Sequence, residues 1–122
     1  MKLMIVDDSL IIRNKIGRSL LSAFSNVYRA SNGHQAVRIA VDERPDVITM
    51  DLTMPELGGV EAIRKIVKVL PNSSILVVSA LADKDTAIQA LADGANGFLC
   101  KPFTDQQLGD AITRVMRLRG KA

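Results

Sequence analysis

The stretch Val47-Ile48-Thr49-Met50-Asp51 decides the fold of this chain, because four residues suited to a buried strand run directly into an acid. The same pattern occurs near the N-terminus, where Leu3-Met4-Ile5-Val6 runs into Asp7-Asp8, and Phe98-Leu99-Cys100 runs into Lys101. The runs at residues 3–6 and 47–50 lack the apolar–polar alternation of a strand with one exposed face, so we expect a parallel sheet covered on both faces. Since the carboxyl ends of parallel strands meet at one edge, the pattern brings these charges together.

Apolar runs alternate with stretches of helical spacing about five times along the chain, which is typical of stacked βα units. The spacing predicts helix caps at three positions: Ser9, Asp83, where the helix would carry Ala87, Ile88 and Leu91, and Thr104, where Gln107 completes a capping box. Strands are expected at residues 3–6, 26–30, 47–50, 75–78 and 98–100, the second of them at an edge of the sheet because it is more polar. The sequence therefore predicts one doubly wound α/β domain over residues 1–122.

The composition supports a single domain with an aliphatic core. Of the 122 residues, 48% are hydrophobic but only 3% are aromatic, and a chain of this size can bury a core without disulfides. The formal charge is +3 with acids and bases interspersed, which together with the scarcity of aromatic residues disfavours nucleic-acid binding. The single cysteine fits a reducing compartment, and no segment approaches the about 18 apolar residues of a membrane span. We expect a cytoplasmic protein that binds neither nucleic acid nor membrane.

Five polar side chains each follow a predicted strand: Asp7, Asp8, Asp51, Ser79 and Lys101. Carboxylates so close together repel one another unless a cation lies among them, so the set indicates a divalent metal and an anionic group beside the lysine. A hard cation such as Mg²⁺ prefers carboxylate and carbonyl oxygens. Asp51 is the best candidate nucleophile, because a carboxylate between a metal and a lysine can attack phosphorus to give an acyl phosphate. Lys101 and Ser79 would then supply a positive charge and a hydroxyl donor to the phosphoryl oxygens.

At these residues the chain resembles the receiver domains of two-component response regulators, and among them the small chemotaxis regulators. The resemblance covers essentially the whole chain. It rests on four motifs: Val6-Asp7-Asp8-Ser9, Asp51-Leu52-Thr53-Met54-Pro55 followed by Gly58-Gly59, Val78-Ser79-Ala80, and Lys101-Pro102-Phe103. It implies a five-stranded parallel sheet in the order 2-1-3-4-5 with five helices in a three-layer sandwich.

The resemblance also implies roles for the site residues. Asp51 would take a phosphoryl group from a histidine kinase, and Asp8, Asp51 and the carbonyl of Thr53 would bind Mg²⁺. Asp7 would join the metal site mainly through water. Ser79 and Lys101 would hold the phosphoryl group, with Lys101 aimed by a cis bond to Pro102, since an X–Pro bond is where a cis peptide costs least.

Three further positions carry expectations from the family. Phe98 matches an aromatic position that turns inward when the hydroxyl of Ser79 moves to the phosphate, although a plain core aromatic is an equal interpretation. In a switch of this kind, the effector would bind the face formed by the fourth helix, the fifth strand and the fifth helix. Thr53 and Leu81 would border the path of hydrolytic water and tune the phosphoryl lifetime, and an apolar Leu81 predicts slow loss of phosphate.

The main hypothesis is therefore a phosphorylation-dependent switch that catalyses only its own phosphorylation and dephosphorylation. The leading alternative is an Asp-nucleophile phosphohydrolase of haloacid-dehalogenase type, but such an enzyme has an acid two residues after the nucleophile, where this chain has Thr53. The sequence favours a stand-alone receiver, and a receiver cut from a longer regulator remains open.

Overall fold

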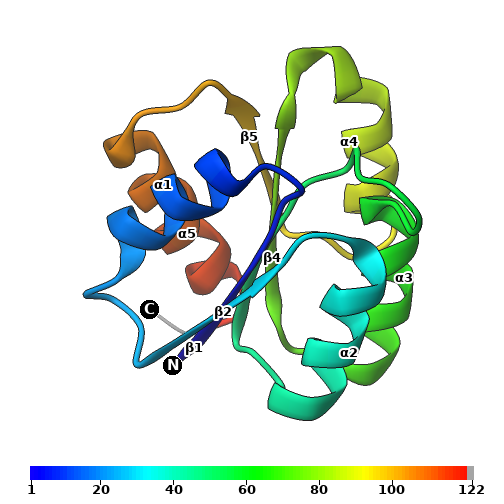
Figure 1. The fold of residues 1–122 in the computed structure, drawn as a ribbon, viewed down its shortest axis with the longest axis horizontal. Helices are drawn as coiled ribbons and strands as arrows, with labels where there is room; N and C mark the ends of the chain where they lie inside the picture. Colours follow the sequence, from blue (N-terminus) through cyan, green and yellow to red (C-terminus); the bar gives the residue numbers. More distant parts are fainter. Residues whose placement is uncertain (121–122) are drawn as a thin grey trace.

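A five-stranded parallel sheet lies between two layers of helices in the computed structural model, which describes residues 1–120 except for the side chain of Leu81 (Figure 1). The strands follow the order β2-β1-β3-β4-β5, as predicted. Their bounds are β1 Lys2–Val6, β2 Asn26–Ala30, β3 Val47–Met50, β4 Ser74–Ala80 and β5 Gly97–Lys101. The predicted strands are thus all present; β1 is longer than predicted at its start, and β4 and β5 are longer by one or two residues at each end.

The helices divide between the two faces of the sheet. One face is covered by α1 (Leu10–Leu20) and α5 (Asp105–Leu118), and the other by α2 (Gly33–Glu43), α3 (Gly59–Val69) and α4 (Lys84–Ala92) (Figure 1). A short 3-10 turn, η1 (Leu81–Asp83), links β4 to α4. Every strand is followed by a helix, so every strand ends at the same edge of the sheet.

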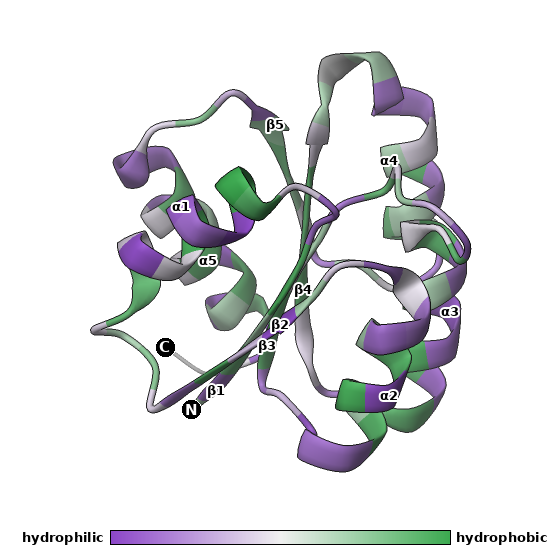
Figure 2. Cartoon of the chain, in the orientation of Figure 1, coloured by the Kyte–Doolittle hydropathy of each residue, from purple (hydrophilic) through white to green (hydrophobic). Residues whose placement is uncertain are grey.

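Two apolar cores fill the spaces between the sheet and its helix layers. The core beneath α2, α3 and α4 includes Met4, Ile48 and Ile63, whereas the core beneath α1 and α5 includes Leu3, Ile16 and Leu108. Both Leu3 and Met4 are fully buried although they are neighbours on β1, because side chains of a strand alternate between its faces. Figure 2 shows the central strands as the most continuous hydrophobic segments, which is the pattern that predicted a sheet covered on both faces.

The predicted helix caps are confirmed at Ser9 and Thr104. The Ser9 hydroxyl accepts from the backbone N–H of Ile12 at 3.3 Å, and Thr104 forms a reciprocal capping box with Gln107. At Asp83 the prediction of a side-chain cap is wrong: the residue lies at the N-cap position just before α4, but its carboxylate makes no cap hydrogen bond. That carboxylate binds two hydroxyl groups of the site instead.

The apolar pattern predicted for α4 is also partly wrong. Ala87 and Ala90 face the core, whereas Ile88 and Leu91 are 57% and 42% exposed. The small alanine side chains allow the helix to lie close to its neighbours, so the larger apolar residues remain on the solvent side.

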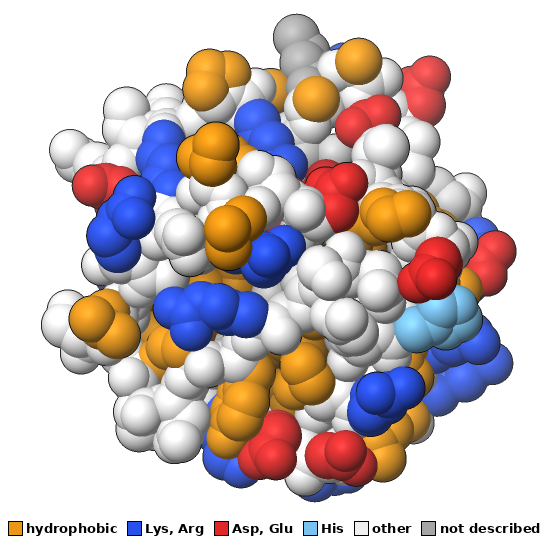
Figure 3. All heavy atoms as spheres, in the orientation of Figure 1, with side chains coloured by type: hydrophobic (Ala, Val, Ile, Leu, Met, Phe, Trp, Pro, Cys, Tyr) orange, Lys and Arg blue, Asp and Glu red, His pale blue; other side chains and the backbone are white. Residues whose placement is uncertain are grey.

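Two surface properties bear on the predicted class of protein. Among the described residues, no helix is both long and apolar enough to cross a membrane. Basic and acidic side chains both occur on the face shown in Figure 3, with apolar and uncharged groups between them. This agrees with the interspersed charges along the chain.

Candidate functional site

Neighbouring strands deliver the two buried acids of the site. Val6 of β1 lies beside Met50 of β3 in the sheet register, so the next residues, Asp7 and Asp51, leave the sheet at the same edge. The backbone N–H of Asp51 donates to the carbonyl of Val6 at 2.9 Å, which extends the pairing past the end of β3. Asp7 is held by backbone as well, since its N–H donates to the carbonyl of Ala30 at 3.1 Å.

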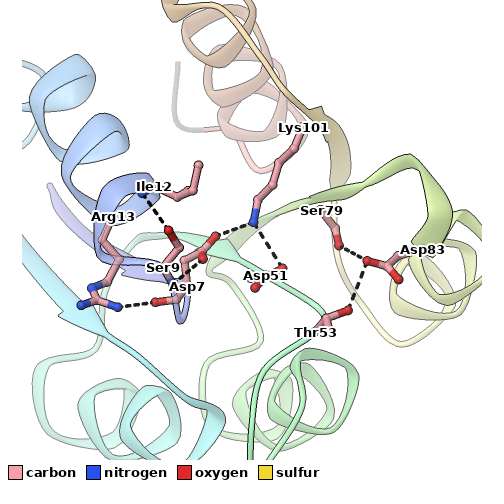
Figure 4. Close-up of polar contacts among 9 residues, drawn as sticks. All are labelled: Asp7, Ser9, Ile12, Arg13, Asp51, Thr53, Ser79, Asp83 and Lys101. Atoms are coloured by element: carbon pink, nitrogen blue, oxygen red, sulfur yellow. Dashed lines mark hydrogen bonds and ion pairs between the residues drawn. The ribbon is translucent and has the colours of Figure 1, made fainter.

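Lys101 lies between these acids, at the end of β5 (Figure 4). Its Nζ is 2.8 Å from Oδ2 of Asp7 and 3.6 Å from Oδ1 of Asp51. The other oxygen of Asp7 accepts from the backbone N–H of Ser9 at 2.9 Å, and the guanidinium of Arg13 donates to the Asp7 carbonyl at 2.7 Å. Asp7 is therefore held through both carboxylate oxygens and its carbonyl, whereas Asp51 is held by Lys101 and by a hydrogen bond from the backbone of Thr53.

Burial and charge make Asp51 an unusual carboxylate. The pKa of its carboxyl group is raised from an ordinary value of 3.8 to about 6, first by burial and then by the negative charge of Asp7, with the positive charge of Lys101 opposing both. For Lys101, burial by itself would lower the pKa, but the hydrogen bond to Asp7 and the charges of both acids outweigh it and raise the pKa. The site thus holds one firmly protonated lysine and one acid with an excess of negative charge around it.

Three carboxylates form a cluster that fits a divalent cation. One oxygen from each of Asp7, Asp8 and Asp51 lies within 4.8 Å of the others, and Asp8 is exposed to solvent. Hard cations such as Mg²⁺ take carboxylate oxygens and retain water ligands, so two buried acids and one exposed acid suit such an ion. Lys101 neutralises only part of this charge. The metal ligands predicted from the sequence therefore lie together, and the carbonyl of Thr53 follows on the loop just after Asp51.

The two glycines that follow the second motif, Gly58 and Gly59, shape this loop. The N–H of Gly59 donates to the carbonyl of Leu52 at 3.1 Å, and a Cβ at this position would collide with the carbonyl oxygen of Asp51. Only glycine permits α3 to begin this close to the acceptor. Gly59 therefore makes a tight entry into α3.

A second group of polar side chains lies beside the acids, at the ends of β3 and β4 (Figure 4). The hydroxyl of Ser79, which is fully buried, donates to Oδ2 of Asp83 at 2.9 Å. The hydroxyl of Thr53 donates to the same oxygen at 3.2 Å. One carboxylate therefore binds the hydroxyl groups of both Ser79 and Thr53.

Asp83 is the residue of this site that sequence reasoning missed. The sequence predicted that Asp83 caps a helix, and this prediction left out its hydrogen bonds to Ser79 and Thr53. The available signal was its spacing, because a residue four positions after a strand-ending serine lies within reach of that serine across a short turn. The side chain of Leu81, predicted to tune the lifetime, lies outside the described residues.

The remaining predicted positions are placed as follows. Phe98 lies in β5 beside Val77 and is partly buried against the core under α2, α3 and α4. The peptide bond between Lys101 and Pro102 is cis, as the resemblance implied. Phe98 is thus neither fully buried nor fully exposed.

Comparison with known proteins agrees with this geometry. Residues 3–113 match the family model described as the response regulator receiver domain. The chain is 36% identical over 117 residues to the chemotaxis protein CheY of Thermotoga maritima, covering 95% of this chain and 98% of that protein. It is 34% identical over 116 residues to the chemotaxis protein CheY of Bacillus subtilis, covering 94% and 97%.

Solved structures show the same fold. The crystal structure of the Vibrio cholerae chemotaxis protein CheY4 superposes with a TM-score of 0.85 at 31% sequence identity, covering 93% of this chain and 97% of that one.

Proposed function

The chain belongs to the response regulator receiver domain family, and we propose that it acts as a phosphorylation-dependent switch in which Asp51 accepts a phosphoryl group from a histidine kinase. One observation carries the proposal: Lys101 and a buried acid, Asp7, flank a second acid whose pKa is raised to about 6. Receiver domains are signalling switches that interact with histidine kinases and downstream effectors, and this arrangement supplies the chemistry that such a switch needs.

In the proposed reaction, a carboxylate oxygen of Asp51 attacks the phosphorus of a phosphohistidine. The new O–P bond forms as the P–N bond breaks, and the imidazole leaves with the bonding electron pair and takes up a proton. Lys101 holds a positive charge beside the transferred group, where it offsets the charge on the phosphoryl oxygens. The Ser79 hydroxyl is the nearest neutral donor at the end of β4.

Asp7, Asp8, Asp51 and the carbonyl of Thr53 would hold Mg²⁺ in this site. The ion would supply positive charge to the acids and to the phosphoryl oxygens. The three carboxylates support this assignment because their mutual repulsion is compensated by only one lysine among the described residues.

The output of the switch is proposed to pass through Ser79 and Phe98. When Ser79 turns toward the phosphoryl group, Phe98 would move inward from its partly buried position and change the face formed by α4, β5 and α5. The exposed Ile88 and Leu91 on α4 offer apolar contact area for an effector protein on this face. We propose that Thr53 and Leu81 tune the lifetime of the phosphoryl group, and that Leu81→Glu speeds its loss.

Further proposals follow from the same assignment. The protein works in the cytoplasm, without binding nucleic acid or membrane through this domain, and it turns over no external substrate. A stand-alone receiver and a receiver within a longer regulator would use the same site chemistry.

Incubation with acetyl phosphate and Mg²⁺, followed by mass spectrometry, tests the proposal. We expect one added phosphoryl group on the wild-type chain and on Asp110→Asn, a matched change of an exposed acid on α5, and none on Asp51→Asn. Addition that does not depend on Asp51 would contradict the proposal. Steady turnover of a phosphate ester would favour the phosphohydrolase alternative instead.

A further inference from the structure

Asp83 binds the two hydroxyl groups of the site through a single carboxylate oxygen. Ser79 donates to this oxygen at 2.9 Å and Thr53 donates at 3.2 Å (Figure 4). In the part of the chain that the structure describes, no lysine, arginine or histidine forms an ion pair with Asp83. Its side chain also makes no cap hydrogen bond to α4. The two hydroxyl groups are therefore the contacts that hold this carboxylate in place.

The bond to Asp83 competes directly with a bond to a phosphoryl group. A serine hydroxyl carries one hydrogen and so donates one hydrogen bond at a time. In this structure Ser79 gives that hydrogen to Asp83, and a hydrogen bond to a charged acceptor is stronger than one to a neutral acceptor. Ser79 can donate to a phosphoryl oxygen on Asp51 only after it has left Asp83.

The second bond stabilises this arrangement from the neighbouring loop. Thr53 lies two residues after Asp51, and its bond to Asp83 joins the loop after β3 to the turn after β4. The bond from Thr53 thereby helps to hold Asp83 in the position in which it accepts from Ser79. Release of Ser79 would leave Asp83 with Thr53 and water as its remaining donors.

We propose that Asp83 is a positioning residue that holds Ser79 in the unphosphorylated arrangement and so opposes phosphorylation of Asp51. This inference rests on the proposed function, because it assumes that Ser79 donates to the phosphoryl group. A ligand that requires the released form of Ser79 binds only the molecules in which Ser79 is released. Its apparent affinity is therefore the intrinsic affinity multiplied by the fraction of released molecules. Removing the acceptor at residue 83 raises that affinity.

The test uses beryllofluoride, a phosphoryl mimic, titrated with Mg²⁺ into the full chain and followed by amide NMR. We expect Asp83→Ala to lower the half-saturating concentration about tenfold, which corresponds to about 1.4 kcal/mol. Asp83→Asn keeps an acceptor oxygen but removes the charge, so we expect an intermediate value. Asp85→Ala, which removes an exposed acid two residues further along, should match the wild-type protein.

Repeating the Asp83→Ala change in a Ser79→Ala background distinguishes an effect that acts through the Ser79 hydroxyl from direct charge repulsion by Asp83. If Asp83 acts through Ser79, the tenfold shift falls below about twofold in this background, because the two changes are then coupled. A shift of equal size with and without the Ser79 hydroxyl would show plain charge repulsion and overturn the inference. No shift in either background would overturn it too.

Phosphoryl loss provides an independent readout. With acetyl phosphate removed, we expect the phosphoryl group on Asp51 to last as long or longer in Asp83→Ala, because the rival acceptor for Ser79 is gone. Slower loss with an unchanged beryllofluoride titration would mean that Asp83 acts on hydrolytic water, and the inference would be wrong. If the wild-type chain gains no phosphoryl group at Asp51, the proposed function fails together with this inference, whereas normal gain without any Asp83 effect overturns the inference alone.

Discussion

The site has two halves that hold their polar groups in opposite ways. The acid half is formed by Asp7, Asp8, Asp51 and Lys101. It contains three carboxylates and one lysine, so negative charge is in excess. The hydroxyl half, formed by Thr53, Ser79 and Asp83, satisfies both of its donors internally, through one carboxylate.

This difference indicates how the two halves would respond to a phosphoryl group and its cation. The acid half gains from a cation because repulsion between its carboxylates is relieved. The hydroxyl half must instead break an existing hydrogen bond before it can offer Ser79. One half therefore favours the ligand and the other half opposes it, and a switch needs a balance of this kind between two states.

Removing Lys101 should cause the largest loss of stability among the changes in the acid half. We expect Lys101→Ala to lower the free energy of unfolding by about 4 kcal/mol in metal-free buffer at pH 8, because two buried carboxylates lose the lysine that forms an ion pair with each of them. Lys65→Ala, an exposed change on α3, is the control, and urea denaturation is the measurement. A loss below about 1 kcal/mol would show that solvent already screens the acids.

Neutralising Asp51 should raise the free energy of unfolding, whereas removing Lys101 should lower it. A carboxyl group whose pKa is raised in the folded state from 3.8 to about 6 contributes stability below pH 3.8 that is lost as the pH rises through 6. At 1.36 kcal/mol per pH unit, this loss is at most about 3 kcal/mol. We expect Asp51→Asn to be more stable than the wild-type protein by up to that amount at pH 8 without metal, and the advantage to disappear near pH 4.

Urea denaturation at both pH values checks this prediction, with Asp110→Asn as the control. An advantage of equal size at both pH values would contradict it, because a packing effect does not depend on ionisation of the acid.

Magnesium should stabilise the acid half by a smaller amount. At a Mg²⁺ concentration ten times the dissociation constant, the free energy of unfolding should rise by about 1.4 kcal/mol. We expect Asp8→Asn to lose most of this rise while it keeps its fold, since Asp8 is the exposed member of the cluster. Thermal denaturation with and without Mg²⁺ measures the difference. An undiminished rise in Asp8→Asn would exclude Asp8 as a ligand.

The placement of the strands followed from the sequence because burial on both faces leaves a plain signature, whereas their order was implied by the resemblance to receiver domains. Val47–Met50 carries no polar alternation, and the structure pairs it on both sides, with β1 and with β4. The face of α4 could not be predicted in the same way. Its larger apolar residues, Ile88 and Leu91, point to solvent, and hydrophobicity alone assigns them to the core.

The acid half was predictable for the same reason as the strands. Asp7, Asp51 and Lys101 each interrupt an apolar run at its end, so topology alone brings them together. Asp83 follows no such rule. An aspartate at a helix start has a common local explanation, and only the positions of the two hydroxyl groups show that its carboxylate turns away from its own helix.

The smallest expected effect lies at Thr53, and it sharpens the comparison because it weakens the hydroxyl half without changing any charge. Thr53→Val removes an exposed hydrogen bond of 3.2 Å to Asp83, so we expect a loss of only about 0.5 kcal/mol in the free energy of unfolding. Thr113→Val removes a comparable exposed bond of 3.0 Å to the Gly109 carbonyl, away from the site, and controls for the loss of a hydroxyl. Asp83 keeps its bond to Ser79 in Thr53→Val, so beryllofluoride should bind at most about twofold tighter, well short of the effect of Asp83→Ala. If Thr53→Val matches Asp83→Ala in that titration, the bond between the two loops holds the unphosphorylated arrangement, and Ser79 is not the group through which Asp83 acts.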